Sequence, residues 1–338
     1  MILRKLYYLL VKGSGLVLEQ DKTKEGTSVQ YTLKSAVSFA GVGLHSGQPV
    51  RMTVRPASAD YGIWFRRTDI IGLDAMVPAI WSAVTPSKLC TVIENEEGVS
   101  VSTIEHIMAA LAGCGIHNAL IDIDGPEVPI LDGSAEPFVA GFLVHGLQKQ
   151  IAEVRTIRVL RKVEVTEGEA IARLEPSDAY EIDFKIDFAE EAIGQQSRSL
   201  RLTNGAFVRE LSDSRTFCRQ ADVDAMQARG LALGGTLENA VVFDGDKVLS
   251  PGGLRHEDEP VRHKMLDAVG DLALAGAPLL GRYTGIRAGH AMTNRLLRAL
   301  FADPANYRIE DCAGRIGEKL LGVGVHRADL PSQRHRAA

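Results

Sequence analysis

The chain has 338 residues, a length that suits two domains with a core of their own. Hydrophobic residues make up 45% of the sequence and charged residues 24%, as in an ordinary soluble globular protein. The net charge of −5 argues against nucleic acid as a principal partner, because binding to phosphate backbones requires a basic surface.

The cysteines indicate a reducing compartment. The chain has four, and no two of them form a C-x-x-C pair, which excludes a cysteine-rich zinc module and argues against a disulfide framework. No stretch approaches the roughly 20 apolar residues of a membrane-spanning helix. We therefore expect a cytoplasmic protein without an integral membrane segment. The four are Cys90, Cys114, Cys218 and Cys312.

Both ends of the chain are expected to lie outside the folded domains. Residues 1–27 begin with MILRKLYYLLVKGSG, in which basic residues precede a short apolar run. No small-residue cleavage site follows, so we interpret this segment as a poorly ordered extension and not as a signal peptide. Residues 306–338 are expected to form a C-terminal tail, whose polar end ADLPSQRHRAA frays.

Residues 28–150 are predicted to start with strands and to continue with a helix, a strand and a helix. The strands are indicated by alternation of apolar and polar residues between Gly, Pro and Ser. Ser102 or Thr103 can cap the first helix, and Gly115 can end it. The predicted elements are strands within 29–66, a helix at 102–116, a strand at 118–125 and a helix at 134–147.

Residues 151–305 are predicted to repeat this order. Pro260 lies near the first turn of the longest helix, and Gly276 lies at its end. The repetition predicts an α+β fold of two similar two-layer sandwich domains, each a sheet packed on helices, with a boundary near residue 150. The predicted elements are strands within 152–165 and at 181–189, a helix at 220–229, a strand at 239–245, a helix at 259–276, a strand at 281–289 and a helix at 293–302.

The segment RHKMLDAVGD places three polar residues on one face of the 259–276 helix. His263, Asp267 and Asp271 follow one another at intervals of four residues. His263 and Asp267 could present two metal ligands from consecutive turns, although many solvated helices carry the same pair. The rest of this helix is apolar, so its polar groups are expected to be buried and to need partners.

Two further segments could complete a metal site. His106 could supply a third ligand, and the adjacent Glu105 could reach a bound water. In the alternative interpretation, Glu105 belongs to a capping box in STIE and His106 is a half-buried core histidine. His290 lies in a Gly-flanked loop before the last helix and is either a surface residue or, near a carboxylate such as Asp271, a general acid.

The glycine-rich segment 230–241 gives no support for a nucleotide cofactor. Its sequence GLALGGTLENAV matches neither the P-loop nor the dinucleotide-binding fingerprint. The turn-rich segments SRTFC at 214–218 and LDGSAEPF at 131–138 are by themselves uncharacteristic and could be simple connections.

Taken together, these segments resemble the UDP-3-O-acyl-N-acetylglucosamine deacetylases, the zinc amidases of lipid A biosynthesis. The resemblance runs in order from about residue 28 to about residue 302. The matching stretches are GVGLHSG (41–47), KLCT (88–91), STIEHIMAALAGCGIHNALIDIDGPEVPILDGSAEPF (102–138), SRTF (214–217), GLALGG (230–235), EDEPVRHKMLDAVGDL (257–272) and GHAMTN (289–294).

The resemblance implies a fold, a site and a reaction. The fold would pair two α+β sandwiches with the active site at their interface. One catalytic zinc ion would catalyse hydrolysis of the N-acetyl group of UDP-3-O-(3-hydroxyacyl)-N-acetylglucosamine to acetate and the free 2-amine, the committed step of lipid A biosynthesis. The family further implies a monomer in the cytoplasm of a Gram-negative-type bacterium.

The resemblance also implies a role for each matching residue. The zinc ligands would be His106, His263 and Asp267. The catalytic groups would be Glu105 as general base, His290 as general acid or oxyanion partner, Asp271 as the carboxylate that orients His290, and Thr216 as a hydroxyl that stabilises the oxyanion. Phe217 and Lys264 would contact substrate, Leu89 and Asp222 would border it, and residues from 218–243 would line a passage for the acyl chain.

Two other functions are weighed against this one. A zinc amidase acting on another N-acyl sugar would share the same motifs, because these specify the chemistry more tightly than the substrate. A sugar-nucleotide-binding protein with a structural zinc would need a fourth ligand or would lack Glu105, and the sequence indicates neither.

Overall fold

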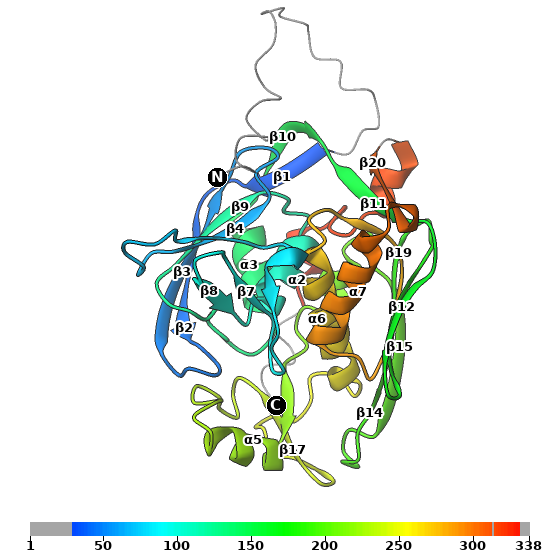
Figure 1. Cartoon of the computed structure of the whole chain (residues 1–338). Helices are drawn as coiled ribbons and strands as arrows, with labels where there is room; N and C mark the ends of the chain where they lie inside the picture. Colours follow the sequence, from blue (N-terminus) through cyan, green and yellow to red (C-terminus); the bar gives the residue numbers. More distant parts are fainter. Residues whose placement is uncertain (1–28, 313, 332–338) are drawn as a thin grey trace, which may run out of the picture.

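The computed structural model describes residues 29–312 and 314–331 (Figure 1). The expected extension 1–27 and the last seven residues lie outside this part of the chain. Within it, no helix is both long and apolar enough to cross a membrane.

The first half is built on a five-stranded sheet. Along β3 the side chains of Val50, Met52 and Val54 alternate into the core, as the sequence pattern predicts. Phe39 on the edge strand packs edge-on against Phe138 of α3 (Glu136–His145), with ring centroids 4.9 Å apart. The sheet order is β2 (Val37–Val42), β3 (Pro49–Pro56), β9 (Ala119–Ile123), β4 (Ile63–Arg67) and β5 (Met76–Pro78).

Two smaller sheets complete this half. One precedes α2 (Glu105–Gly113) and consists of β6 (Val84–Thr85), β7 (Val92–Glu94) and β8 (Ser100–Ser102). The other pairs β1 (Val29–Leu33) with β10 (Leu147–Glu153), which runs through the predicted boundary at residue 150. The division into two domains at that residue stays a prediction.

The second half contains a seven-stranded sheet. β19 is at its centre, because it pairs with β13, β14 and β11. Residues 307–311, expected to belong to the C-terminal tail, form a strand that pairs with β11. The strands are β11 (Arg155–Val159), β12 (Val163–Glu167), β13 (Ala170–Glu175), β14 (Tyr180–Asp187), β15 (Gln195–Arg201), β19 (Leu279–Ile286) and β20 (Tyr307–Asp311).

A separate group of short elements closes the end of the molecule that lies lowest in Figure 1. There β17 pairs with β16 on one side and β18 on the other, and α5 follows β16 directly. The elements of this region are β16 (Phe217–Arg219), α5 (Gln220–Gln227), β17 (Val241–Asp244) and β18 (Lys247–Val248). The short helix α4 (Ala206–Glu210) lies elsewhere, where Phe207 packs against Gly113 at the end of α2.

Three helices lie side by side in the middle of the molecule (Figure 1). They are α2, α6 (Glu259–Ala273) and α7 (His290–Ala302). The backbones of α2 and α6 touch where Gly270 passes the carbonyl oxygen of Glu105, since a Cβ atom at residue 270 would clash with that oxygen. One continuous hydrophobic core joins both halves around these helices.

The α+β fold class predicted from the sequence is confirmed, and two local predictions are wrong. Neither Ser102 nor Thr103 caps α2: the residue before the helix is Ile104, and Thr103 donates its hydroxyl to Glu127 over 3.0 Å. His290 is not in a loop, because α7 begins at His290 itself, three residues before the predicted start.

Candidate active site

Three buried side chains from α2 and α6 converge on one point. His106 lies in the first turn of α2, and His263 and Asp267 lie one turn apart on α6. The Nε2 atoms of His106 and His263 lie 3.6 Å and 3.3 Å from Oδ1 of Asp267. Ligand-type atoms of all three residues lie within 4.8 Å of one another. The fold thus brings together the three residues that the sequence singled out as metal ligands.

The geometry of these three residues fits a metal ion. Oδ1 of Asp267 is buried and has no hydrogen-bond partner among the described residues, whereas a buried carboxylate oxygen normally has one. Around a tetrahedral zinc ion with bonds of roughly 2.1 Å, two ligand atoms lie about 3.4 Å apart. The two measured distances to Oδ1 bracket that value. Two imidazole nitrogens and one carboxylate oxygen are also a donor set used by catalytic zinc sites.

Neighbouring groups hold His263 and Asp267 in forms that bind metal. Nδ1 of His263 lies 3.0 Å from the carbonyl oxygen of Ser214, and donation to this oxygen leaves Nε2 with a free lone pair. Burial lowers the pKa of His263 to about 4, so its ring is neutral at pH 7. Lys264 donates to Oδ2 of Asp267 over 2.8 Å. Although burial opposes it, interactions with the neighbouring His263 and with the charged Lys264 hold the pKa of Asp267 well below its usual range.

Glu105 begins α2 immediately before His106. Its side chain is buried, and Oε2 accepts a hydrogen bond from the backbone N–H of Thr91 over 3.0 Å. Burial raises the pKa of Glu105 above its ordinary value, because a charged carboxylate loses its hydration there. A carboxylate of raised pKa beside a group of metal ligands is suited to accept a proton from a water.

His290 faces the same point from the first turn of α7. Its Nε2 lies 3.8 Å from Oε1 of Glu105 and 3.9 Å from Oδ2 of Asp267, and its Nδ1 lies 2.9 Å from Oδ2 of Asp271. Burial disfavours the charged ring, but the carboxylates of Asp271 and Glu105 outweigh it and raise the pKa of His290 to about 9. The imidazolium is therefore present at pH 7, the form that can donate a proton.

Thr91 connects Glu105 with the His290–Asp271 pair, a role that the sequence did not suggest. Its hydroxyl donates to Oδ1 of Asp271 over 2.5 Å, while its backbone N–H donates to Glu105. The KLCT segment contains Thr91, but nothing in these four residues indicates that a hydroxyl reaches α6. Only the packing of the two halves brings Thr91 to Asp271.

A cavity of about 1000 Å³ opens at this cluster. All of the predicted site residues line it except Asp271, which lies behind His290. The lining residues among them are Leu89, Glu105, His106, Thr216, Phe217, Asp222, His263, Lys264, Asp267 and His290. The predicted site residues other than Asp271 therefore face one common cavity.

The predicted substrate-contacting residues differ in their surroundings. The ring of Phe217 lies edge-on to His263, with centroids 6.3 Å apart, and thus borders the metal-ligand group. Leu89 is 42% exposed and lies on the rim. Asp222 is paired with Arg219 at 2.6 Å, so its charge is already compensated.

The cavity continues between Phe188 and the short elements that include α5. This part of its wall is largely apolar and includes Val223, Met226, Leu231 and Val242. These four residues fall within 218–243, the region expected to line a passage for an acyl chain.

Comparison with known sequences agrees with this geometry. The sequence model of a family described as UDP-3-O-acyl N-acetylglycosamine deacetylase matches residues 30–302. The chain belongs to this deacetylase family.

Several members of the family are similar over nearly their whole length. The chain is 49% identical over 289 residues to a protein of Phenylobacterium zucineum (strain HLK1), which covers 86% of this chain and 99% of the relative. It is 46% identical over 276 residues to a protein of Pasteurella multocida (strain Pm70), and the match covers 81% of this chain and 90% of that protein. A protein of Anaeromyxobacter sp. (strain Fw109-5) is 46% identical over 280 residues, and the match covers 83% of this chain and 91% of that protein. All three are named UDP-3-O-acyl-N-acetylglucosamine deacetylase.

Within this deacetylase chain, a second residue missed from the sequence shapes the entrance to the site. Glu127 accepts hydrogen bonds from the backbone N–H groups of His45 and Ser46 and from the Thr103 hydroxyl. It thereby ties the GVGLHSG loop to the segment that leads into α2. Thr103 has a φ of 57°, a left-handed conformation that is costly for a β-branched residue. His45 and Thr103 both line the catalytic cavity.

Proposed function

We propose that the chain is a zinc-dependent deacetylase that removes the N-acetyl group of UDP-3-O-(3-hydroxyacyl)-N-acetylglucosamine. The products are acetate and the free 2-amine, and the reaction is the committed step of lipid A biosynthesis. The observation that carries the proposal is the convergence of three metal-type ligands, a buried carboxylate and a charged histidine in one cavity. The names of the similar proteins supply the substrate.

His106, His263 and Asp267 would hold one zinc ion. A zinc ion with three protein ligands lowers the pKa of a bound water and polarises a carbonyl oxygen. The unpaired Oδ1 of Asp267 and the neutral ring of His263 support this assignment, because both offer lone pairs that no other described group uses. Within the described part of the chain the group has three members and not the four of a structural zinc site, which argues against a purely structural role.

Glu105 would act as the general base. Its carboxylate takes the proton of the attacking water. The raised pKa brings its proton affinity closer to that of an effective general base near neutral pH. The N–H of Thr91 holds Oε2, so that Oε1 is the oxygen turned toward His290. The oxygen bound by Thr91 is fixed in orientation, which restricts the carboxylate to one productive geometry.

His290 would act on a charged group that forms later in the reaction. As an imidazolium held by Asp271 it either protonates the departing 2-amine or stabilises the oxyanion while Glu105 returns its proton. The hydroxyl of Thr216 would donate a hydrogen bond to the same oxyanion. Phe217 and Lys264 would contact the substrate, with Leu89 and Asp222 at its border.

The two parts of the cavity suit the two ends of the substrate. The apolar part formed by residues from 218–243 would take the acyl chain. The cavity wall also carries the cations of Lys88, Arg229 and Lys264, which can attract a diphosphate. We place this enzyme in the cytoplasm as a monomer.

The test is an assay with UDP-3-O-acyl-N-acetylglucosamine before and after treatment with a chelator. We expect turnover to disappear on chelation and to return with Zn²⁺. Glu105→Gln should keep the zinc and lose most of the turnover, whereas Glu96→Gln, which changes an exposed glutamate of the same half, should keep both. Full activity of Glu105→Gln would contradict the general-base assignment.

The same assay separates this function from a zinc amidase for other N-acyl sugars. UDP-N-acetylglucosamine without the acyl chain should be a far poorer substrate, because it leaves the apolar part of the cavity empty. Equal turnover of both compounds would favour the broader amidase.

A further inference from the structure

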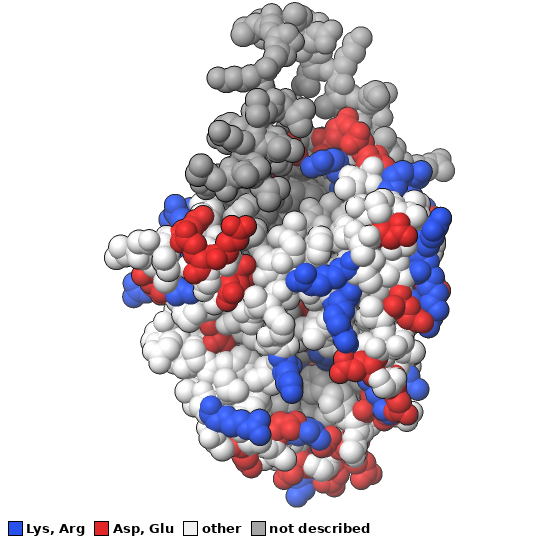
Figure 2. Space-filling model, viewed as in Figure 1, with Lys and Arg blue, Asp and Glu red and all other residues white. Residues whose placement is uncertain are grey.

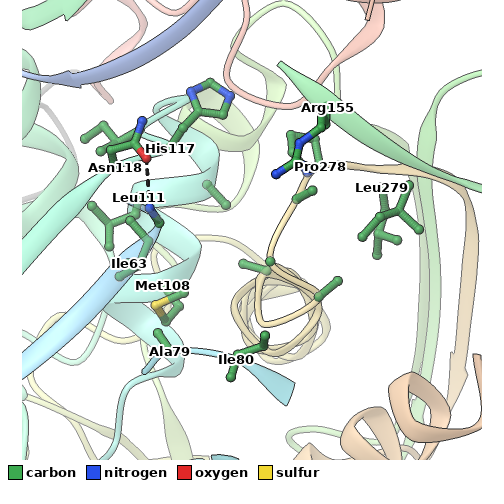
Figure 3. Close-up of a pocket in the computed structure, with 18 of the residues that line it drawn as sticks. Ile63, Ala79, Ile80, Met108, Leu111, His117, Asn118, Arg155, Pro278 and Leu279 are labelled. Atoms are coloured by element: carbon green, nitrogen blue, oxygen red, sulfur yellow. Dashed lines mark hydrogen bonds between the residues drawn. The ribbon is translucent and has the colours of Figure 1, made fainter. Parts of the chain in front are cut away.

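A second cavity lies between the two halves of the chain, at the C-terminal ends of α2 and α6 (Figure 3). It has a volume of about 420 Å³, within the range of small-molecule sites. Met108 and Leu111 of α2, Val269 and Leu272 of α6 and Leu279 of β19 contribute to its mostly apolar wall. None of the predicted site residues lines it, so it is separate from the catalytic cavity.

One residue of the cavity wall carries a buried polar group without a partner in the described part of the chain. Tyr180, the first residue of β14, lines the cavity and is 3% exposed. Its hydroxyl makes no hydrogen bond with any described residue. Burial raises the pKa of this phenol, so it remains a neutral donor. Because a buried hydroxyl is normally hydrogen-bonded, this one points to a polar atom of a ligand.

One cation at the cavity also lacks a partner. Arg155 lies on β11 on the same side as the buried Ile157, two residues further on, and its side chain reaches toward the cavity in Figure 3. Among the described residues, none forms an ion pair or side-chain hydrogen bond with it. Arg155 is exposed, so its guanidinium lies where the cavity meets solvent.

Three further polar residues of the wall already have hydrogen-bond partners. Nδ1 of His117 accepts the backbone N–H of Tyr31, and burial lowers the pKa of His117 to about 4, so that it is neutral at pH 7. The side chain of Asn118 makes three hydrogen bonds, one of them to the N–H of Gly62. Asp60 accepts from the Gln30 side chain over 2.8 Å. Arg155 is the single Lys or Arg among the described residues that line the cavity, so it is the group that can pair with an anionic ligand.

We propose that this cavity binds a single-chain organic anion, with the apolar chain between α2 and α6, the anionic group at Arg155 and a chain oxygen at the Tyr180 hydroxyl. The ligand chemistry is that of a hydroxylated long-chain carboxylate. The size of the cavity suits one chain, and a guanidinium at the mouth pairs with a carboxylate by charge-assisted hydrogen bonds.

Such a ligand would contact the two helices that carry the catalytic residues. α2 holds Glu105 and His106 in its first turn and Met108 in the cavity wall, while α6 holds Asp267 and the wall residue Val269. The ligand would bind the helices at their observed spacing and so stabilise the folded chain.

Binding is tested on the full chain with dodecanoate, chain-hydroxylated dodecanoates and dodecanol, by calorimetry. We expect dodecanoate to bind about tenfold more weakly to Arg155→Gln, and dodecanol to bind both proteins alike, because only the charged contact is removed. Arg161→Gln, which changes an exposed arginine that does not line the cavity, is the matched control and should bind dodecanoate normally.

The Tyr180 contact has its own test. A hydroxylated dodecanoate that reaches Tyr180 should bind about fivefold more tightly than dodecanoate, and Tyr180→Phe should abolish this gain while binding of dodecanoate is unchanged. The variant removes a hydroxyl without a partner, so it should fold normally. If no hydroxylated chain gains affinity, or if the gain survives in Tyr180→Phe, the Tyr180 contact is wrong.

The location is tested separately from the proposed deacetylase activity. Calorimetry needs no turnover, so its result stands whether or not that activity is correct. Equal affinity of the wild type, Arg155→Gln and Arg161→Gln would place the chain elsewhere, for instance in the catalytic cavity, and would overturn the proposal. Absence of binding at about 1 mM would also overturn it.

Discussion

The hydroxyl of Thr91 donates a hydrogen bond to Oδ1 of Asp271 over 2.5 Å, and this bond joins the two halves of the chain at the candidate active site. Asp271 in turn holds His290, and the N–H of Thr91 holds Glu105. One residue from the first half therefore orients both groups proposed to move protons. Thr91 contacts Glu105 directly and acts on His290 through Asp271.

Replacing Thr91 tests this link. In Thr91→Val, Asp271 loses its hydroxyl donor in a buried setting, which costs about 1–3 kcal/mol, so we expect kcat to fall about tenfold or more. Thr91→Ser keeps the hydroxyl and should restore most of the activity. The readouts are kcat, KM and zinc content, and we expect KM and zinc content to change little. Equal kcat values for the Val and Ser variants would show that the hydroxyl has no positioning role.

The close crossing of α2 and α6 predicts that Gly270 cannot be replaced. In Gly270→Ala the added Cβ atom clashes with the carbonyl oxygen of Glu105, so the helices must separate. We expect a loss of about 1–3 kcal/mol in the free energy of unfolding, measured by urea denaturation, together with weaker zinc binding. Gly125→Ala is the control, because its Cβ atom would meet no heavy atom closer than 3.4 Å. Equal stability of the two variants would refute a tight crossing.

Removal of the metal should destabilise the chain. The proposed zinc ion would need the assembled group of His106, His263 and Asp267, so a chelator should lower the thermal midpoint, and added Zn²⁺ should restore it. In Asp267→Asn we expect little response to either addition, measured by calorimetry. Asp246→Asn changes an exposed residue and should respond like the wild type. A metal-independent midpoint in the wild type would contradict the assignment of a zinc site.

His117 predicts part of the acid sensitivity of the fold. Burial lowers its pKa from 6.5 to about 4, so between these values the unfolded chain binds a proton that the folded chain does not. The contribution to stability is complete above pH 6.5 and is lost as the pH falls toward 4, by at most about 3 kcal/mol.

The measurement compares the wild type with His117→Asn. The asparagine oxygen can accept the N–H of Tyr31 in place of Nδ1 but does not titrate. Denaturation at a series of pH values should therefore give a flatter acid limb for the variant. Parallel loss of stability in both proteins would mean that His117 does not contribute.

Which side chains share one face of a helix could be predicted from the sequence. An apolar helix with His263 and Asp267 four residues apart has only one way to present both side chains, and the structure places them on one point. The alternation in β3 and the helical pattern of α2 likewise predict these elements, because local periodicity determines which side of an element is buried.

Relationships between distant segments could not be predicted in this way. Thr91 reaches Asp271 across 180 positions of sequence, and no local pattern records that contact. The capping residue of α2 was predicted wrongly because Thr103 adopts a left-handed φ and donates its hydroxyl to Glu127. The sequence pattern predicts the start of α7 three residues too late, because a glycine usually indicates a loop, whereas Gly289 is here the N-cap residue of the helix.

On the face shown in Figure 2, the Lys and Arg side chains of the described residues do not gather in a broad patch of the kind that binds polyanions. Lys and Arg side chains are interspersed with Asp and Glu on the face shown in Figure 2. This agrees with the net charge of −5 and with a small-molecule substrate that enters a cavity.

The short elements around α5 stand apart from the helices that hold the catalytic groups. α5 contacts β16 and β17, whereas the catalytic side chains lie on α2, α6 and the start of α7. In the proposed function, proton transfer would rest on side chains of α2, α6 and α7, and contact with the acyl chain on residues 218–243. Substitutions within 218–243 would then change the preferred chain length while the three helices keep their sequence.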